Sequence, residues 1–191
     1  TGTKASGAEI SGYSGALEVN VVDFGADKKG KKDSSKAIQK ALDYAIDNGS
    51  NSVQIKVVVP KGKYRIDKLL EIYSNTWLYL EDGATIVRNF DKGCMIKNAQ
   101  ANGAGGYGSE RNIVIEGGCW DGNPSSTSRP FSNMRFGHMK NLWIKNVEIK
   151  NNYNGHHVEI GGVKGITIED CDFHGYTGTF QKEAIQLDTI S

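Results

Sequence analysis

The sequence contains no run of about 18 apolar residues, which is the length that a membrane-spanning helix needs. It also lacks an excess of either charge, because 23 basic side chains stand against 22 acidic ones and leave a net charge of +1. This balance gives no indication of nucleic acid or an anionic membrane as a partner. Three cysteines are present, an odd number without metal-site spacing, so neither a disulfide framework nor a metal site is predicted.

Proline is scarce, with three residues, and hydrophobic residues make up 38% of the chain, whereas glycine reaches 24 residues. Many glycines and few apolar residues favour short strands joined by tight turns over a helical bundle. The 191 residues are enough for one sizeable domain.

The clearest positive feature is a repeat with a period of about 24 residues. The segment 134–151 aligns with 158–175, and each repeat contains three pairs of alternating apolar residues separated by glycine or polar residues. The aligned residues are Met134 with Val158, Phe136 with Ile160, Leu142 with Ile166, Ile144 with Ile168, Val147 with Cys171, and Ile149 with Phe173. Alternation indicates half-buried strands, and three strands in each repeat predict an all-β solenoid, a right-handed parallel β-helix.

The repeat extends in both directions along the chain. The further alignments are Ile113 with Ile166, Ile115 with Ile168, Trp120 with Phe173, Ile185 with Val158, and Leu187 with Ile160. We also assign Leu78 and Leu80 to the Val158/Ile160 pair. A leucine-rich repeat is the alternative fold, but it has one strand and a return segment in each repeat, whereas three strand-like pairs recur here.

One amphipathic helix is predicted over 31–49, with Asp33 or Ser34 as the N-cap and Gly49 at the end. Its apolar stripe consists of Ala37, Ile38, Ala41, Leu42, Ala45 and Ile46. Such a helix would cap the N-terminal end of the stack. We expect 1–17 to be a flexible or extended segment, and 18–191 to be the N-terminal part of a longer β-helix, because the sequence stops inside an apparent central strand.

Three segments resemble the opening of the pectate-lyase-like superfamily: VNVVDFGADKKGKKDSSKAIQKAL (19–42), VVVPKGKYRI (57–66) and LYLEDGATI (78–86). This superfamily includes polygalacturonase-type glycosidases, phage tailspikes and bacterial surface adhesins with a β-helix. The resemblance covers 18–191 and implies a secreted or cell-surface-anchored protein. It also implies that substrate lies on the outer face of the first strand of each coil, which the repeat places at 94–97, 134–136, 158–160 and 185–188.

The resemblance does not extend to the polygalacturonase catalytic motif. In that pattern an aspartate of an Asn-Thr-Asp motif precedes one first strand, and an Asp-Asp pair follows in the next coil. The corresponding positions here hold His156, Lys182 and Glu183.

Alternation places Arg135, Glu159 and Gln186 outward, one above another, on consecutive first strands. His157 and Asp188 share that outward parity, and His156 stacks with Glu183 at the strand entrance. Glu159 and Asp188 are expected about 8 Å apart, which suits inverting hydrolysis. The alternative for this face is a solvated ladder of charges, in which Arg135 and Glu159 form a surface ion pair.

The candidate catalytic residues are therefore Glu159, Glu183, Asp188, His156 and His157. Two loops, 98–111 and 121–131, are expected to form the walls of a groove over this face. The candidate substrate-binding residues are Arg135 and Gln186 on the first-strand face, Tyr107, Arg129 and Phe131 in the loops, and Tyr153.

The first functional hypothesis is a glycosidase that acts on an extracellular polysaccharide with carboxylate acid and base residues. The alternative is a non-catalytic surface adhesin that binds host glycan or glycoprotein, of the plasmin- and fibronectin-binding type. A polysaccharide lyase with Arg135 as base is the third choice. No cofactor and no metal are predicted. The expected partners are a polysaccharide, a glycoprotein or host extracellular proteins, without nucleic acid and without insertion into a membrane.

Overall fold

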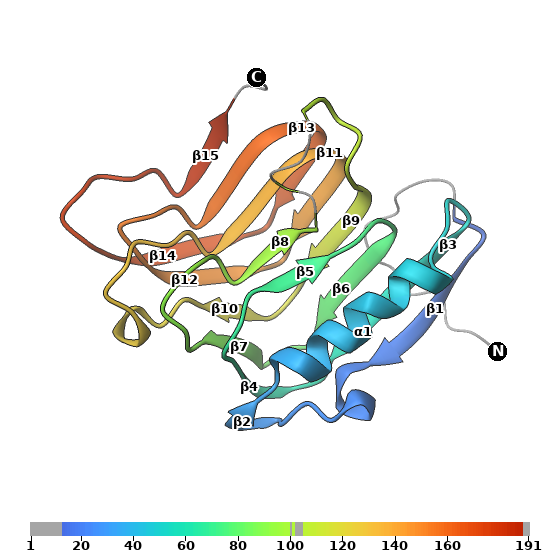
Figure 1. Cartoon of the computed structure of the whole chain (residues 1–191), viewed down its shortest axis with the longest axis horizontal. Coiled ribbons are helices and arrows are strands. Elements are labelled where there is room, and N and C mark those ends of the chain that lie inside the picture. The colour runs from blue at the N-terminus through green and yellow to red at the C-terminus, as the bar shows by residue number, and fades with distance from the viewer. Residues whose placement is uncertain (1–12, 100, 102–104, 189–191) are drawn as a thin grey trace.

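The computed structural model describes residues 13–99, 101 and 105–188, and these residues form a parallel β-helix (Figure 1). The strands form two hydrogen-bonded sheets of nine and six strands among the described residues. The first strand, β1 (Gly15–Asn20), begins before the predicted boundary at residue 18, and residues 1–12 of the predicted N-terminal segment lie outside the described residues. No helix in the described part is long and apolar enough to cross a membrane.

Each coil contains up to three strands, and each strand pairs with the corresponding strand of the next coil. The paired strands form three ladders that run along the stack. The first ladder contains β5 (Leu70–Ile72), β8 (Ile96–Asn98), the beginnings of β11 (Met134–Lys145) and β13 (Val158–Glu169), and β15 (Ile185–Asp188). The second contains β1, β3 (Val53–Val59), β6 (Thr76–Leu80), β9 (Arg111–Glu116) and the ends of β11 and β13. The third contains β2 (Lys29–Asp33), β4 (Gly62–Ile66), β7 (Ala84–Arg88), β10 (Cys119–Asp121), β12 (Glu148–Tyr153) and β14 (Asp172–Thr177). Two short 3-10 helices, η1 (Val21–Phe24) and η2 (Pro124–Ser126), lie between strands.

The register of the ladders confirms the predicted repeat. The observed partners include Met134 with Val158, Phe136 with Ile160, Leu142 with Ile166, Ile144 with Ile168, Ile149 with Phe173, and Ile185 with Val158. Inward side chains therefore lie above apolar side chains of the neighbouring coils and form one continuous core.

The assignment of Leu78 and Leu80 to the first ladder is wrong. Leu78 pairs with Ile115 in the second ladder, whereas Leu70 of β5 pairs with Ile96 and so holds the first-ladder position. The reason is that this coil has a first strand of only three residues, Leu70–Ile72, which carries little alternation for a pattern search to detect.

Asparagine forms one corner of the coils. Asn75, Asn112 and Asn141 all have positive φ, at 63°, 57° and 57°, and Gly165 holds the same position in the next coil at 79°. The side chains form a ladder of their own, in which Nδ2 of Asn141 donates to Oδ1 of Asn112 at 2.9 Å and Nδ2 of Asn112 donates to Oδ1 of Asn75 at 3.2 Å. Asparagine tolerates the left-handed conformation, so one residue type satisfies both the turn and the stacking between coils.

The helix α1 (Ser35–Asn48) covers the N-terminal end of the stack and contacts η1, β3 and β5 (Figure 1). Ser34 is the N-cap but makes no side-chain capping bond; instead Oδ1 of Asp33 accepts a hydrogen bond from the Ser35 backbone N–H at 2.8 Å. The predicted apolar stripe is buried from Ala37 to Ala45, whereas Ile46 in the last turn of the helix is 56% exposed.

The helix also forms hydrogen bonds with the backbone groups at the open edge of the first ladder. The Gln39 amide donates to the carbonyl of Glu71 at 3.0 Å and accepts from the backbone N–H of Glu71 at 2.9 Å. These backbone groups of β5 would otherwise be left for another strand to pair with, so α1 blocks edge-to-edge association at this end.

Replacing Asn112 tests the corner. Asn112→Ala removes both side-chain hydrogen bonds and puts a residue that tolerates the left-handed conformation poorly at a φ of 57°, whereas Asn112→Gly removes the same bonds and tolerates the angle. We expect the free energy of unfolding, measured by urea denaturation, to fall by about 1 kcal/mol in the glycine variant and by about 2 kcal/mol in the alanine variant. Equal losses would show that the backbone angle does not explain the asparagine.

Candidate functional site

The outer face of the first ladder carries a row of charged and amide side chains. Glu71, Lys97, Arg135, Glu159 and Gln186 occupy the same position in five successive strands, so that each lies beside the next. Nζ of Lys97 lies 3.1 Å from Oε1 of Glu71, and Nε of Arg135 lies 3.3 Å from Oε1 of Glu159. The predicted stacking of Arg135, Glu159 and Gln186 is confirmed, and the carboxylates in this row are charge-compensated.

An open cleft of about 500 Å³ lies over this row at the strand entrances. Its lining is polar, with three cationic side chains, two side-chain amides, one histidine and one carboxylate. The residues are Leu69, Gly93, Cys94, Lys97, Pro130, Phe131, Ser132, Arg135, Asn154, Gly155, His156, Glu159, Lys182 and Gln186. Burial raises the pKa of the Cys94 thiol to about 11, so this thiol is protonated at neutral pH and is not poised as a nucleophile.

One wall of the cleft consists of two loops, 89–95 after β7 and 122–133 before β11, and Arg88 at the end of β7 joins them. The Arg88 side chain is fully buried, and its guanidinium lies 4.2 Å from the ring centre of Phe90 and 4.0 Å from that of Phe131. Its Nε and Nη2 donate to the Gly93 carbonyl, both at 3.2 Å, and its Nη1 donates to Oγ of Ser126 at 3.1 Å. Because Gly93 and Phe131 line the cleft, Arg88 holds both sides of that wall in place.

Arg88 remains a cation in this position. Burial lowers its pKa to about 10, against the opposing effect of the nearby Asp91 carboxylate. No carboxylate of the described residues lies within ion-pair distance of it, and the two aromatic faces and the carbonyl oxygen compensate its charge instead.

Further polar contacts join the same two loops. Oδ2 of Asp91 lies 2.8 Å from Nε of Arg129, and the Thr127 hydroxyl donates to the Asp91 carbonyl at 2.6 Å. The amide of Asn123 donates to the Arg88 carbonyl at 3.0 Å. The expectation that 121–131 contributes a wall is therefore supported at its C-terminal end, where Pro130 and Phe131 line the cleft. The expectation of a second wall from 98–111 is wrong for the residues that the structure describes, because none of them lines the cleft.

His156 and Glu183 lie together at the edge of the cleft, as the sequence predicted. Nδ1 of His156 is 2.8 Å from the Glu183 carbonyl oxygen and 3.6 Å from Oε2 of the Glu183 carboxylate. The His156 side chain is buried and lines the cleft, whereas the Glu183 side chain is 75% exposed and does not belong to the lining.

The expectation that His157 faces outward is wrong. Its side chain is buried, and its ring centre lies 6.0 Å from that of Phe173, which packs against the core. His157 precedes β13, at the bend where the chain turns from the third ladder into the first, so the alternation of the strand does not extend to it. Burial lowers the pKa of His157 to about 4, with a further contribution from His174, so the buried ring is neutral at physiological pH.

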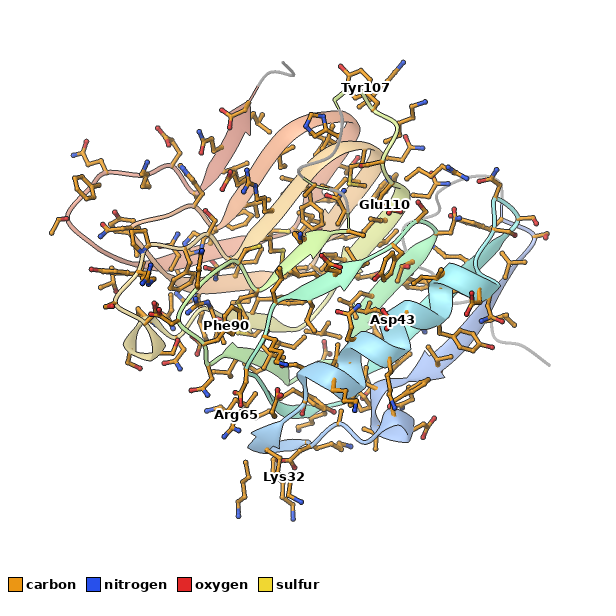
Figure 2. All side chains as sticks on the ribbon, viewed as in Figure 1. Lys32, Asp43, Arg65, Phe90, Tyr107 and Glu110 are labelled. Atoms are coloured by element: carbon orange, nitrogen blue, oxygen red, sulfur yellow. The ribbon has the colours of Figure 1, made fainter. Side chains whose placement is uncertain are left out.

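The remaining predicted residues lie outside the cleft lining. Asp188 pairs with Gly161 and accepts a hydrogen bond from the Gln186 amide at 3.2 Å. Arg129 is engaged by Asp91, and the backbone of Tyr153 pairs with that of Phe131, which is itself only 4% exposed and offers little ring surface to a sugar. Figure 2 shows Tyr107 at a far edge of the molecule, in the loop 98–111, of which residues 100 and 102–104 lie outside the described residues.

Sequence reasoning missed several residues of the site. Lys97 pairs with Arg135, so extending the outward row by one coil to 94–97 would have identified it. Ser132 donates to Oε2 of Glu159 at 3.3 Å, and Lys182 lines the cleft from the segment before β15. Arg88 carried no signal, because its burial depends on loops whose path a repeat pattern does not predict.

A second hollow, of about 460 Å³, lies at the corner between the second and third ladders and is lined by Asp82, Glu148, Asp170 and Asp172 among others. Burial alone would raise the pKa of Glu148, but hydrogen bonds from Lys150, Cys119 and His174 outweigh it and lower the pKa to about 2. No group of three or more potential metal ligands occurs among the residues that the structure describes.

Comparison with known proteins places this geometry in a family. Residues 18–187 match the family described as "Rhamnogalacturonase A/epimerase, pectate lyase-like". The chain is 28% identical over 205 residues to plasmin and fibronectin-binding protein A of Streptococcus pneumoniae, in an alignment that covers 91% of this chain and 27% of that protein.

Solved structures agree on the fold. The surface protein and adhesin PfbA of Streptococcus pneumoniae superposes with a TM-score of 0.76 at 24% identity, over 88% of this chain and 46% of the other. A family 28 exopolygalacturonase of Yersinia enterocolitica superposes with a TM-score of 0.70 at 18% identity, over 84% of this chain and 39% of the other. The chain thus spans less than half the length of these relatives.

The burial of His157 predicts a dependence of stability on pH. The pKa of His157 is about 4 in the folded protein and 6.5 ordinarily. Between these pH values the imidazole is protonated in the unfolded chain and neutral in the folded protein. This contribution to stability is complete above pH about 6.5 and is lost as the pH falls towards about 4, with a maximum of about 3 kcal/mol. We expect urea denaturation at a series of pH values to show a smaller loss for His157→Leu than for the unmodified protein. His138→Asn, which removes a more accessible histidine, should keep the full loss; the same loss in His157→Leu would contradict the assignment.

Proposed function

The chain belongs to the rhamnogalacturonase A/epimerase, pectate lyase-like family, and from this premise we propose that it is a cell-surface β-helix whose first-ladder cleft binds an acidic glycan without cleaving it. The bound chain would run along the stacked strands, across Lys97, Arg135 and Gln186. It would be a polysaccharide or the glycan of a host glycoprotein, and the protein would act as an adhesin.

The observation that carries this proposal is that a single carboxylate, Glu159, lines the cleft among the described residues. Glycoside hydrolysis by the common mechanisms needs two carboxyl groups that flank the scissile bond, one as acid and one as base or nucleophile. Glu159 is already held by Arg135 at 3.3 Å and by the Ser132 hydroxyl at 3.3 Å. A carboxylate that is held in this way can orient Arg135 and Ser132, but it is poorly placed to act as a general acid or base.

The rest of the lining suits binding. Lys97, Arg135 and Lys182 supply cationic donors, and Asn154 and Gln186 supply amides that can donate to and accept from sugar hydroxyls. Lys182 has no ion pair within the described residues, so its charge is available to a glycan carboxylate. The wall that Arg88 holds fixes the shape of the cleft beside these groups before a ligand arrives, which reduces the entropy lost on binding.

The relatives support an adhesin, but only as an analogy. The pneumococcal relative is named for binding plasmin and fibronectin, and PfbA is described as a surface protein and adhesin. This chain spans 27% of the length of that relative, and the binding named for the relative belongs to the whole protein. Binding of host proteins by this chain is therefore part of the proposal.

A glycosidase remains the second candidate, because of the His156 and Glu183 pair. The Glu183 carboxylate is 75% exposed beside the cleft and lies 3.6 Å from the His156 ring nitrogen. A ligand that brings Glu183 over the cleft would place it as a second carboxyl group with Glu159.

The experiment is a titration of the protein with uronate-containing oligosaccharides, in which calorimetry measures binding and reducing-end and ultraviolet assays measure cleavage. We expect binding without release of reducing ends or unsaturated products. Arg135→Gln should weaken binding about tenfold, which corresponds to about 1.4 kcal/mol. The matched control is Lys140→Gln on the same strand, β11, beyond the bend at His138 and outside the cleft lining, which should bind as the unmodified protein does.

Formation of reducing ends that is lost in Glu159→Gln or Glu183→Gln would replace this proposal with the glycosidase. Unsaturated products would favour a lyase. Equal effects of Arg135→Gln and Lys140→Gln would remove the cleft from the binding site.

A further inference from the structure

A concentration of positive charge lies at the N-terminal edge of the third ladder, away from the cleft. The segments 27–36 and 61–68 contain nine cationic side chains and three carboxylates, although the whole chain has a net charge of +1. The cations are Lys28, Lys29, Lys31, Lys32, Lys36, Lys61, Lys63, Arg65 and Lys68; we call this set the basic edge. Figure 2 shows Lys32 and Arg65 at the same edge of the molecule, beside β2 and β4.

The backbone of the basic edge is held in a defined conformation by Asp27. Its carboxylate accepts hydrogen bonds from the backbone N–H groups of Lys29 at 3.1 Å, Lys31 at 2.7 Å and Lys32 at 2.8 Å. The Asp27 backbone N–H in turn donates to Oγ of Ser34 at 3.0 Å. Asp27 thus holds the backbone of this loop, and the side chains of Lys28, Lys29, Lys31 and Lys32 are exposed.

This loop is joined to the next coil. The Lys63 backbone N–H donates to the Lys28 carbonyl at 2.8 Å, and Nη1 of Arg65 donates to the Lys31 carbonyl at 3.1 Å. Lys29 is paired with Lys63 across the ladder, so their side chains rise side by side from adjacent strands. Like charges placed opposite each other destabilise a sheet, and a bound anion would relieve that repulsion.

The lysines of the basic edge have no carboxylate partner within the described residues. Of the nine cations only Arg65 forms an ion pair, with Asp67 at 2.9 Å. The Asp33 carboxylate accepts hydrogen bonds from Ser35 and from the backbone of Asp67 and makes no ion pair with any lysine of the described residues. Nine cations against three carboxylates leave the two segments with a net charge of +6 (9 − 3). Lys28, Lys29, Lys31 and Lys32 are all exposed.

We propose that the basic edge is a binding surface for a linear sulfated polysaccharide of the heparin type. Such a chain carries closely spaced anionic groups, and two rows of lysines on adjacent strands can contact several of them at once. The fixed loop presents these charges with little backbone ordering on binding. This surface shares no residue with the cleft and does not depend on the function proposed for it.

The composition of the edge favours a sulfated glycan over nucleic acid. Eight of the nine cations are lysines, which act as hydrated point charges, whereas arginine is the residue that matches phosphate geometry with two bonds. Single-stranded nucleic acid also needs exposed aromatic rings for base stacking, and the aromatic residue of the two segments, Tyr64, is fully buried.

The test measures the affinity of the protein for size-defined heparin at several sodium chloride concentrations, with neutral dextran and duplex DNA as comparison ligands. The triple variant Lys29→Gln, Lys31→Gln, Lys32→Gln keeps the backbone bonds to Asp27. The control is Lys40→Gln, Lys140→Gln, Lys164→Gln, which removes the same charge from exposed positions elsewhere. We expect at least a tenfold loss of heparin affinity in the first variant and less than a twofold loss in the control.

The salt dependence gives a second readout. If the lysines release counterions from the polyanion, the slope of log affinity against log salt should decrease by about two to three in the triple variant and remain unchanged in the control. Equal losses in the two variants, or the absence of heparin binding, would overturn the proposal. Tighter binding to duplex DNA than to heparin at the same salt would also overturn it, in favour of a nucleic-acid surface.

Discussion

The strands of each coil form their backbone hydrogen bonds with the coils above and below, and this constraint determines both the interior and the exterior of the molecule. A side chain in one coil lies about 4.8 Å from the side chain at the same position in the next. Inside, the constraint places apolar residues over apolar residues, as in Met134 over Val158. Outside, it aligns Lys97, Arg135, Glu159 and Gln186 in one row, and that row is the floor of the cleft.

The row has chemical consequences because its charges form two ion pairs, with the two cations as neighbours in the middle of the row. Glu71 is compensated by Lys97, and Glu159 by Arg135, so the floor presents paired groups that can exchange hydrogen bonds with a ligand. The depth of the cleft comes from a different source, the two loops that Arg88 fastens from inside. Burying a guanidinium between two aromatic rings costs desolvation free energy. Its position behind the wall therefore indicates that a fixed wall shape is needed for function.

The facing of residues inside strands was predictable from the sequence, whereas corners were predicted only in part: the stacking of His156 with Glu183 was foreseen, and the direction of His157 was not. Alternation within each repeat gives the correct facing of Arg135, Glu159 and Gln186 because these residues lie inside first-ladder strands. It fails for His157, which precedes its strand. Leu78 faces inward as alternation predicts, but it was assigned to the wrong ladder because the short strand β5 hides the start of its coil. The asparagines at positive φ and the path of the loop 121–131 depend on contacts between coils. The basic edge was missed for another reason, since a balanced total charge conceals a local excess of lysine.

The most direct measurement of the central claim is a crystal structure of the protein with a bound uronate oligosaccharide. The account predicts sugar density along the first ladder, in contact with Lys97, Arg135 and Gln186, and with the wall formed by Gly93 and Phe131 in the position it has without ligand. Sugar density in the acidic hollow beside Glu148, with the first-ladder cleft empty, would contradict it.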